Sequence, residues 1–287
     1  MGEPIKLING DEVGFCFTIE PELEEDQVWC ATVLPLLEGL PANSIDIWQY
    51  CVTEMVNNVI DHSEGSRLTV VVQRRPLNTR VRVLDDGIGI FTKITAAFNL
   101  EDETQAILEL SKGKLTTDPV RHSGQGIFFT SRMLDGFSIL SRGAYFSHEA
   151  TRPVDWILHD DNPGSSTMVT MALDNNTDRT LKDVFDQYSS GDNYDFSKTV
   201  VPLRLARFGE EKLISRSQAK RALARVERFK AVVFDFAGIE MIGQAFADEI
   251  FRVWARAHED VECMVIDASP DVRKMIAAVG PAANVNY

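Results

Sequence analysis

A carboxylate, an amide and an imidazole recur at intervals of four residues in one segment of this chain, as Glu54, Asn58 and His62. In an α-helix, residues four apart lie on the same face, so these side chains would form a row. Such a row can hold a hydrated cation through its amide oxygen and orient a nucleophile through its carboxylate. Asn57 and Asp61 flank the row and are further candidates. A solvated polar helix face is the alternative that this segment alone leaves open.

An apolar stripe on the opposite side of the same segment supports the helix. Its members are Ile45, Trp48, Val52, Met55, Val56 and Val59. The sequence from Pro41 to Ser44 breaks the preceding helical pattern and supplies Asn43 or Ser44 as the expected N-cap. We therefore expect a helix that ends near Ser63, buries its apolar side and presents the polar row.

The first of three glycine-containing segments runs from Asp85 to Ile90, directly after an expected strand. A carboxylate at a strand end can accept a hydrogen bond from an exocyclic amine, and glycines let a flat ring approach the backbone. Asp85, Gly87, Gly89 and Ile90 are therefore candidates to contact such a ring. A plain hairpin turn is the alternative for an Asp-Asp-Gly sequence in isolation.

The second glycine segment precedes an expected helix over 127–134 and contains Ser123, Gly124, Gln125, Gly126 and Ile127. Backbone N–H groups at a glycine-rich helix start bind phosphate oxygens, although a flexible loop would have the same composition. The third segment runs from Gly164 to Thr167, where the Thr167 hydroxyl can reach a ring nitrogen at the start of a strand.

Strand and helix patterns divide the chain into two domains around a polar linker. In residues 1–176 they predict a helix over 25–39 and strands over 13–19, 67–74, 79–84, 137–141 and 167–173. Helices that cover one face of such a sheet give an α+β sandwich. We expect a linker over 177–196, because this stretch is polar and holds little that could form a core.

Residues 197–287 alternate between strand and helix, which is typical of a small α/β domain. The expected strands cover 199–205, 231–236 and 262–266, and the expected helices cover 215–229, 245–257 and 270–279. The strand over 231–236 is continuously apolar, as in parallel strands that are buried on both faces.

The composition excludes several classes of protein. With 287 residues, of which 44% are hydrophobic, the chain can fill two cores. No apolar run approaches the roughly 18 residues of a membrane span, and the N-terminus has no basic segment followed by an apolar one, as a secretory signal would. The four cysteines are scattered, which predicts a reduced, cytoplasmic protein without structural zinc or disulfides.

The net charge of −14 disfavours direct nucleic-acid binding. The charge is uneven, because residues 201–230 contain nine Lys or Arg and three Glu. A solvated helix face is the simplest explanation of this basic window. Docking onto an acidic surface, such as the first domain of the same chain, is the alternative.

The order of these motifs resembles the Bergerat-fold ATPases: DNA gyrase, the ninety-kilodalton heat-shock chaperone, sensor histidine kinases and MutL. The resemblance covers about residues 13–173, and the spacing of Glu54, Asn58 and His62 is especially similar to that in the anti-sigma-factor kinases of this superfamily. It implies a Bergerat-type α/β sandwich that binds ATP and Mg²⁺.

The same resemblance implies a role for each candidate residue. Glu54 would be the catalytic base or orienting group, and Asn58, with Asp61 beside it, would hold Mg²⁺ through its amide oxygen. Asp85 would bind the adenine amine. The adenine side would further involve Gly87, Gly89, Ile90 and Thr167, and the phosphates would lie against Ser123, Gly124, Gln125, Gly126 and Ile127.

Residues 91–123 would form a lid over the nucleotide, with Lys112 as a point charge that meets the γ-phosphate. A solvated loop charge is the alternative for Lys112, as for Lys114 and Arg121. Only about 20 residues precede the first expected helix and none is His, so histidine autophosphorylation is disfavoured. ATP hydrolysis and phosphorylation of a partner's Ser or Thr are the reactions that the resemblance leaves.

The segment from Val232 to Ile250 resembles the strand–loop–helix centre of STAS domains, the anti-sigma-factor antagonists, and the similarity extends over about 197–280. Those antagonists carry a phosphorylatable Ser or Thr at the start of the helix, where this chain has Gln244 and Ala245. The resemblance therefore implies a STAS-like variant without the usual phosphoswitch.

Together, the two resemblances imply a cytoplasmic signalling protein that binds ATP or ADP and acts by partner switching on a regulatory protein. A non-catalytic, nucleotide-sensing module is the alternative function. A homodimer is left open by the sequence.

Overall fold

The computed structural model describes residues 5–9, 11–116, 123–150, 152–159, 166–190, 195–207 and 212–286. Their contacts form two compact units. The first unit comprises Met1–Glu103 and Thr117–Val184, and the second comprises Thr104–Thr116 and Phe185–Tyr287. The expected domains, 1–176 and 197–287 around a linker, stay a prediction. The contacts add that residues 104–116 pack with the C-terminal part of the chain.

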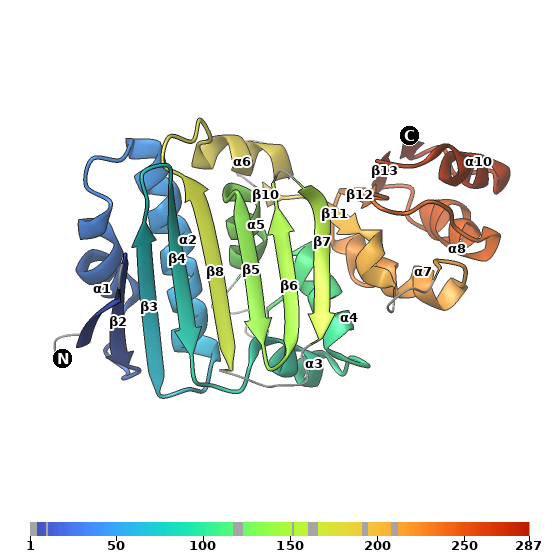
Figure 1. Ribbon diagram of the computed structural model, residues 1–287. Coiled ribbons are helices and arrows are strands. Elements are labelled where there is room, and N and C mark those ends of the chain that lie inside the picture. Colours follow the sequence, from blue (N-terminus) through green and yellow to red (C-terminus); the bar gives the residue numbers. More distant parts are fainter. Residues whose placement is uncertain are drawn as a thin grey trace. The chain divides into compact units, whose positions relative to one another are not determined.

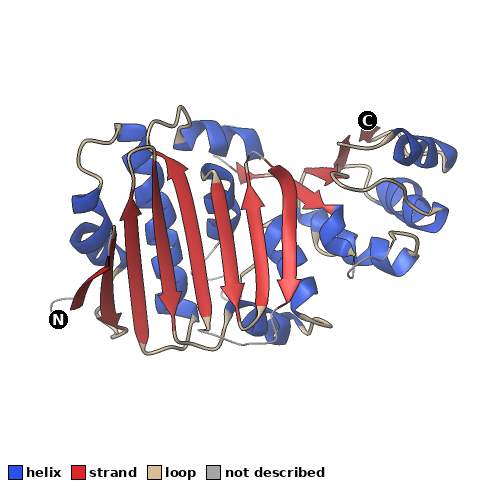
Figure 2. Cartoon of the chain, in the orientation of Figure 1, coloured by secondary structure: helices blue, strands red, loops and turns tan. Residues whose placement is uncertain are grey.

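The first unit is built on an eight-stranded antiparallel sheet in the order β1-β2-β3-β4-β8-β5-β6-β7 (Figures 1 and 2). The strands are β1 Ile5–Asn9, β2 Glu12–Thr18, β3 Arg67–Arg74, β4 Asn78–Asp85, β5 Gly136–Ser141, β6 Ala144–Glu149, β7 Arg152–His159 and β8 Thr167–Asp174. The sequence patterns predict five of them and miss β1, β6 and β7. The mixed α+β class is confirmed.

Helices α2 and α5 lie along one face of this sheet (Figure 1). The helices of the first unit are α1 Glu25–Val28, η1 Trp29–Val33, η2 Leu34–Leu36, α2 Ala42–His62, α3 Ile90–Phe98 and α5 Gly126–Met133. The helix predicted over 25–39 is divided into an α-helical, a π-helical and a 3-10 piece. Pro35 lies in the last piece. Since proline has no N–H, it cannot continue the hydrogen-bond ladder of an α-helix.

The start of α2 differs from the prediction. Pro41 is the N-cap, and neither Asn43 nor Ser44 caps the helix. The Asn43 amide donates instead to the backbone oxygens of Thr177 and Arg179 at 2.7 and 2.9 Å. These residues therefore fasten the helix to the chain that follows β8, a long-range contact that no local pattern indicates.

Alternation along the strands sets which side chains face the helices. The buried residues of β4 are Thr79, Val81, Val83 and Asp85. Successive strand residues point to opposite faces, so the carboxylate of Asp85 lies on the helix-covered face at the end of its strand. In α2 the predicted apolar stripe is buried except at Ile45, which is half-buried, while Ile47 is fully buried.

The second unit contains a four-stranded parallel sheet in the order β11-β12-β13-β14. Its strands are β11 Lys198–Pro202, β12 Ala231–Asp235, β13 Glu262–Ile266 and β14 Val285–Asn286, and a separate pair is formed by β9 Ser189–Ser190 and β10 Asp195–Phe196. Strand β11 is shorter than predicted, because a 3-10 turn, η3 Leu203–Ala206, follows Pro202.

The helices of the second unit are α4 Glu103–Lys112 (from Thr104 on), α7 Arg216–Leu223, η4 Val226–Arg228, α8 Gln244–Asp248, η5 Glu249–Trp254, α9 Ala255–Ala257 and α10 Pro270–Ala278. Helix α7 starts in a capping box, in which the hydroxyl of Ser215 accepts from the backbone N–H of Gln218. The expected alternation of strand and helix is present in this unit.

The predicted linker over 177–196 contains a helix, α6 Leu181–Tyr188, in which Val184 and Tyr188 are buried. This part of the stretch therefore contributes to a core, contrary to the expectation. Residues 191–194 of the stretch lie outside the described residues. Within the part of the chain that the structure describes, no helix has both the length and the apolar character to cross a membrane.

Candidate functional site

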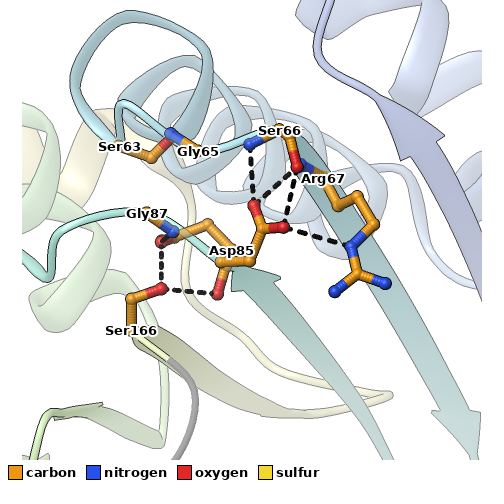
Figure 3. A network of polar contacts seen from close by, with 8 residues as sticks. Ser63, Gly65, Ser66, Arg67, Asp85, Gly87 and Ser166 are labelled. Atoms are coloured by element: carbon orange, nitrogen blue, oxygen red, sulfur yellow. Dashed lines mark hydrogen bonds and ion pairs between the residues drawn. The ribbon is translucent and has the colours of Figure 1, made fainter.

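Asp85 lies at the end of β4 and is 7% exposed. Its Oδ1 accepts a hydrogen bond from the backbone N–H of Gly87 at 2.8 Å and lies 3.0 Å from the hydroxyl of Ser166 (Figure 3). Burial raises the pKa of the Asp85 carboxyl, and the hydrogen bonds from Gly87, Ser166 and Thr167 oppose that rise. The strand end therefore carries a desolvated acceptor that neighbouring groups hold in place.

Thr167, the first residue of β8, stands opposite Asp85 in the antiparallel register. A hydrogen bond from its hydroxyl lowers the pKa of the Asp85 carboxyl. The oxygen of the same hydroxyl, Oγ1, accepts a hydrogen bond from the backbone N–H of Ile90 at 3.2 Å. Ile90 begins α3, and Gly89 before it has a φ of +89°, which favours glycine. Thr167 thus joins Asp85 to the start of α3, and Ile90 takes part through its backbone.

Gly87 packs against the C-terminal end of α2. A Cβ on Gly87 would lie 1.9 Å from the carbonyl oxygen of Ser63, the C-cap of that helix. The backbone N–H of Ile88 donates to the same oxygen at 2.9 Å. Only glycine fits here, because the opposing atom belongs to the backbone and cannot rotate away.

Asp86, next to Asp85, has a different environment. Its Oδ1 accepts from the backbone N–H groups of Ser66 and Arg67 at 2.7 and 2.8 Å, and its Oδ2 accepts from their side chains at 2.9 and 3.1 Å (Figure 3). Burial alone would raise the pKa of Asp86, but these hydrogen bonds hold it well below its usual range. Asp86 therefore fixes the turn after α2 as a charged structural group.

The polar row of α2 lies beside the second glycine segment. A Cβ on Gly126 would lie 2.0 Å from Oε2 of Glu54, so the Glu54 carboxylate is adjacent to the first residue of α5. The side chain of Gln125, the N-cap residue of α5, makes no capping hydrogen bond. The N-terminal end of α5, with its N–H groups and positive dipole end, therefore lies beside the Glu54 carboxylate.

Asn58 follows Glu54 by one helical turn on the same face. Its Nδ2 is buried, and the described residues offer it no hydrogen-bond partner. A buried donor without a partner costs about 1–3 kcal/mol, which an acceptor on a ligand, such as a phosphate oxygen, could recover. Farther along the row, Asp61 is exposed and His62 is half-buried.

The two glycine motifs meet α2 at different heights. Gly126 meets it at Glu54 and Gly87 meets it at Ser63, which corresponds to about 13 Å along the helix axis. The other predicted phosphate contacts are accessible, with Ser123 exposed and Gly124, Gln125 and Ile127 half-buried. The first unit therefore places the loop after β4 and the start of α5 at two points along α2, the helix that carries the polar row.

Lys112 is not part of this arrangement. It belongs to the second unit, is 1% exposed, and donates to Oε1 of Glu109 at 2.8 Å and to the carbonyls of Arg221 and Ala224 at 3.2 and 3.0 Å. Its three protons each have an acceptor, so the predicted contact with a γ-phosphate does not agree with the structure. Arg121 of the expected lid and Gly164 lie outside the described residues.

The sequence patterns do not single out three side chains of this site. The hydroxyl of Ser141 donates to the carbonyl of Ser166 at 2.6 Å. A Cβ on Gly89 would lie 2.8 Å from Cδ of Arg142, a residue in the turn between β5 and β6 with a φ of +46°. The position of Ser166 directly before Thr167 is a signal that could have identified it, whereas Arg142 is brought in by the sheet alone.

Comparison with known proteins adds information on the second unit. Residues 218–273 match a family model described as a STAS-like domain of unknown function (DUF4325). The matched range runs from α7 through β12, α8 and β13 into α10. A search of curated proteins found no match to the chain.

The STAS-like segment has no hydroxyl at the start of α8. Gly243 is the N-cap and Gln244 is the first residue of that helix, followed by Ala245. Serines lie at the N-termini of α7 and α10, where the hydroxyls of Ser215 and Ser269 are both occupied as caps. A STAS-like domain is compatible with a regulatory role, and the usual acceptor position is filled by an amide.

We expect Gly87→Ala to destabilise the protein by about 3 kcal/mol, because the new methyl group would overlap the Ser63 backbone. Urea denaturation of the full chain measures this. Gly136→Ala is the matched control, since its Cβ would meet only the Ala172 methyl at an ordinary 3.7 Å. Equal stabilities of the two variants would contradict the close approach of Gly87 to α2.

We expect Asp85→Asn to be at least as stable as the wild type at neutral pH, and Asp85→Ala to lose about 1–3 kcal/mol because Gly87 and Ser166 lose their acceptor. The raised pKa means that the folded state binds the Asp85 proton more tightly than the unfolded state. This group therefore favours folding below its unfolded pKa of 3.8 and loses that contribution as the pH rises through the folded pKa.

The measurement is urea denaturation as a function of pH. The stability of Asp85→Asn relative to wild type should increase as the pH rises from below 3.8 to neutral. A decrease over the same range would show that the ionised carboxylate stabilises the fold.

Proposed function

We propose that the first unit is a Bergerat-type ATP-binding domain and that the chain is a cytoplasmic signalling protein in which nucleotide state controls a STAS-like module. One observation carries the proposal: helix α2 touches both glycine motifs, with Gly126 against Glu54 and Gly87 against Ser63. Segments that are far apart in the sequence thereby lie against one helix, with the desolvated Asp85 carboxylate near one contact and the start of α5 at the other.

In the proposed complex, Asp85 accepts a hydrogen bond from the adenine amine. Oδ1 is already used by Gly87 and Ser166, so the second carboxylate oxygen would receive the amine. A carboxylate has about four lone-pair sites, which leaves room for one more donor. Gly89, with no side chain, would let the ring approach the start of α3.

The residues beside Glu54 fit a magnesium–phosphate group. Mg²⁺ is commonly held by one or two protein oxygens together with phosphates and waters. The amide oxygen of Asn58 would be one of these ligands, and its buried nitrogen, a hydrogen-bond donor, would meet a phosphate oxygen. When bound, the ion would neutralise phosphate charge. The backbone N–H groups of Gly124, Gln125 and Gly126, at and just before the start of α5, would bind phosphate oxygens, since a helix N-terminus attracts anions.

Glu54 would act on the nucleophile. A carboxylate beside the phosphate-binding helix start can accept a hydrogen bond from a water or a hydroxyl group and later its proton at Oε1 or Oε2. Because Gly126 borders Oε2 so closely, the position of the carboxylate depends on the absence of a side chain at residue 126. The chemistry would be phosphoryl transfer to water or to Ser or Thr of a regulatory partner, through positioning rather than a covalent intermediate.

A non-catalytic nucleotide sensor is the second candidate, and one observation favours it. Lys112, the expected γ-phosphate contact, is coordinated elsewhere by Glu109 and two carbonyls. In that case ATP or ADP would act as a conformational ligand only, and a protein partner would recognise the resulting state. The family match to a STAS-like domain is compatible with partner switching in both cases.

We expect wild-type protein to bind ATP with Mg²⁺, and Glu54→Gln to retain affinity within about threefold while turnover falls by about 10²–10⁴, the usual contribution of a positioned base. Isothermal titration and γ-phosphate-labelled ATP measure the two quantities. Glu64→Gln, at an exposed carboxylate paired with Lys93, is the control. Undetectable ATP binding by the wild type would refute the proposal.

The fate of the label separates the two candidate functions. Label released as phosphate, or found on this chain or on a partner, supports the catalytic form. Intact ATP with measurable binding supports the sensor, and turnover by Glu54→Gln equal to that of the wild type would exclude Glu54 as the base.

We expect Asp85→Asn to bind ATP about 10–100-fold more weakly, because an amine donor would then face an amide group in place of a carboxylate oxygen. Inosine triphosphate, which has a carbonyl where adenine has its amine, provides the control ligand. Wild-type protein should prefer ATP, and Asp85→Asn should lose that preference. A preference that survives in Asp85→Asn would place the adenine elsewhere.

A further inference from the structure

The segment 104–116 lies between the two glycine motifs in the sequence, yet it packs in the second unit. All seven residues from Ala106 to Lys112 are buried in helix α4, and Leu115 after it is buried as well. A helix that is buried on every side belongs to a core. Helix α4 is therefore an internal element of the STAS-like unit.

Buried charges fix α4 in this position. Glu109, 2% exposed, accepts from Lys112 at 2.8 Å through Oε1 and from Arg225 at 3.1 Å through Oε2. The Lys112 ammonium also donates to the carbonyls of Arg221 and Ala224 at the C-terminal end of α7. A cation at a helix C-terminus satisfies free carbonyls and complements the dipole, so Lys112 caps α7 from another part of the chain.

Further contacts extend this surface on both sides of Lys112. The buried hydroxyl of Thr199 in β11 donates to the Lys112 carbonyl at 2.6 Å. Lys114 and Arg228 exchange side-chain and backbone hydrogen bonds at 3.2 and 3.3 Å, and the Lys114 ammonium lies 4.8 Å from the centre of the Phe229 ring. Arg225 and Arg228 both come from the basic window, which here serves as a docking surface for an internal helix.

Both ends of the segment lead to candidate nucleotide residues. Before it, α3 begins at Ile90, whose N–H bonds Thr167, and the Thr92 hydroxyl donates to Oε1 of Glu103 at 2.8 Å. After it, the chain continues to the glycine segment over 123–126. The segment is therefore joined along the sequence to a candidate nucleotide motif at each end.

We infer that the STAS-like unit presents a docking surface for segment 104–116 of its own chain, and that occupancy of this surface is coupled to nucleotide binding in the first unit. The coupling rests on the proposed function. If a nucleotide rearranges the motifs, it changes the free energy of docking, and release of the segment changes nucleotide affinity by the same factor, because coupling is reciprocal. The STAS-like unit thereby sets ATP affinity through the docked segment.

The first experiment needs no nucleotide. Hydrogen exchange of the full chain is compared for wild type, Arg225→Met and Arg252→Met. Both arginines pair with a carboxylate of the same unit, but Arg225 holds Glu109 on α4, whereas Arg252 holds Asp248 one turn away on its own helix. We expect Arg225→Met to speed exchange over 104–112 by about tenfold or more, as loss of a charged hydrogen bond implies, and Arg252→Met to leave it unchanged.

Thr199→Val is a second, milder variant, which keeps the test decisive if Arg225→Met does not fold into a cooperative native state. It removes the hydroxyl that binds the Lys112 carbonyl and keeps the volume of the side chain. Faster exchange over 104–112 in either variant supports docking. Exchange within a factor of about two of wild type in both would overturn it, since hydrogen exchange reports local opening directly.

The second experiment adds Mg-ATP. Coupling predicts that ATP alters exchange over 216–224 in the wild type and that Arg225→Met changes ATP affinity by about fivefold or more, whereas Arg252→Met does not. Wild-type ATP binding with neither effect would overturn the coupling and leave the proposed function intact. No ATP binding by the wild type would overturn both, while the first experiment would still decide whether the segment docks.

Discussion

The candidate site depends on the close approach of helix α2 to two backbone segments that carry no side chain at the point of contact. Gly87 lies against the Ser63 carbonyl and Gly126 lies against the Glu54 carboxylate. Because an α-helix is rigid, these two contacts fix the separation of the strand-end loop and the start of α5 at about 13 Å. A methyl group at either position would move one end of the site relative to the other.

Desolvation acts on several charged groups, and the partners of each group decide its role. Asp85 is buried with a raised pKa and keeps capacity for a further donor, which suits a ligand contact. Asp86 is held ionised by four hydrogen bonds and stabilises a turn. Burial lowers the pKa of Lys112, Glu109 opposes that effect, and every proton of the ammonium has an acceptor. The two neighbouring carboxylates therefore differ in environment, and only Asp86 has the contacts of a purely structural group.

The STAS-like unit is not a self-contained stretch of sequence. The family model covers residues 218–273, whereas the compact unit also takes in β11 and the segment 104–116. Lys112 caps α7, which lies partly within the matched range, so an element from the middle of the chain completes a helix of the later module. The chain therefore passes from one unit to the other three times, after Glu103, after Thr116 and after Val184.

The sequence by itself determined the local elements and the types of chemistry. The period of its apolar residues predicted α2, five strands of the first sheet and the alternating second unit, because burial of one face imposes that period. It also singled out Glu54, Asn58, Asp85 and Thr167, since polar groups at a helix face and at strand ends have few structural reasons to be there. Only the tertiary structure decided that Ser166 and Arg142 join Asp85 and Gly89, and that Lys112 is a buried cap rather than a lid residue. Those outcomes depend on strand register and long-range packing, which bring together residues that no local spacing relates.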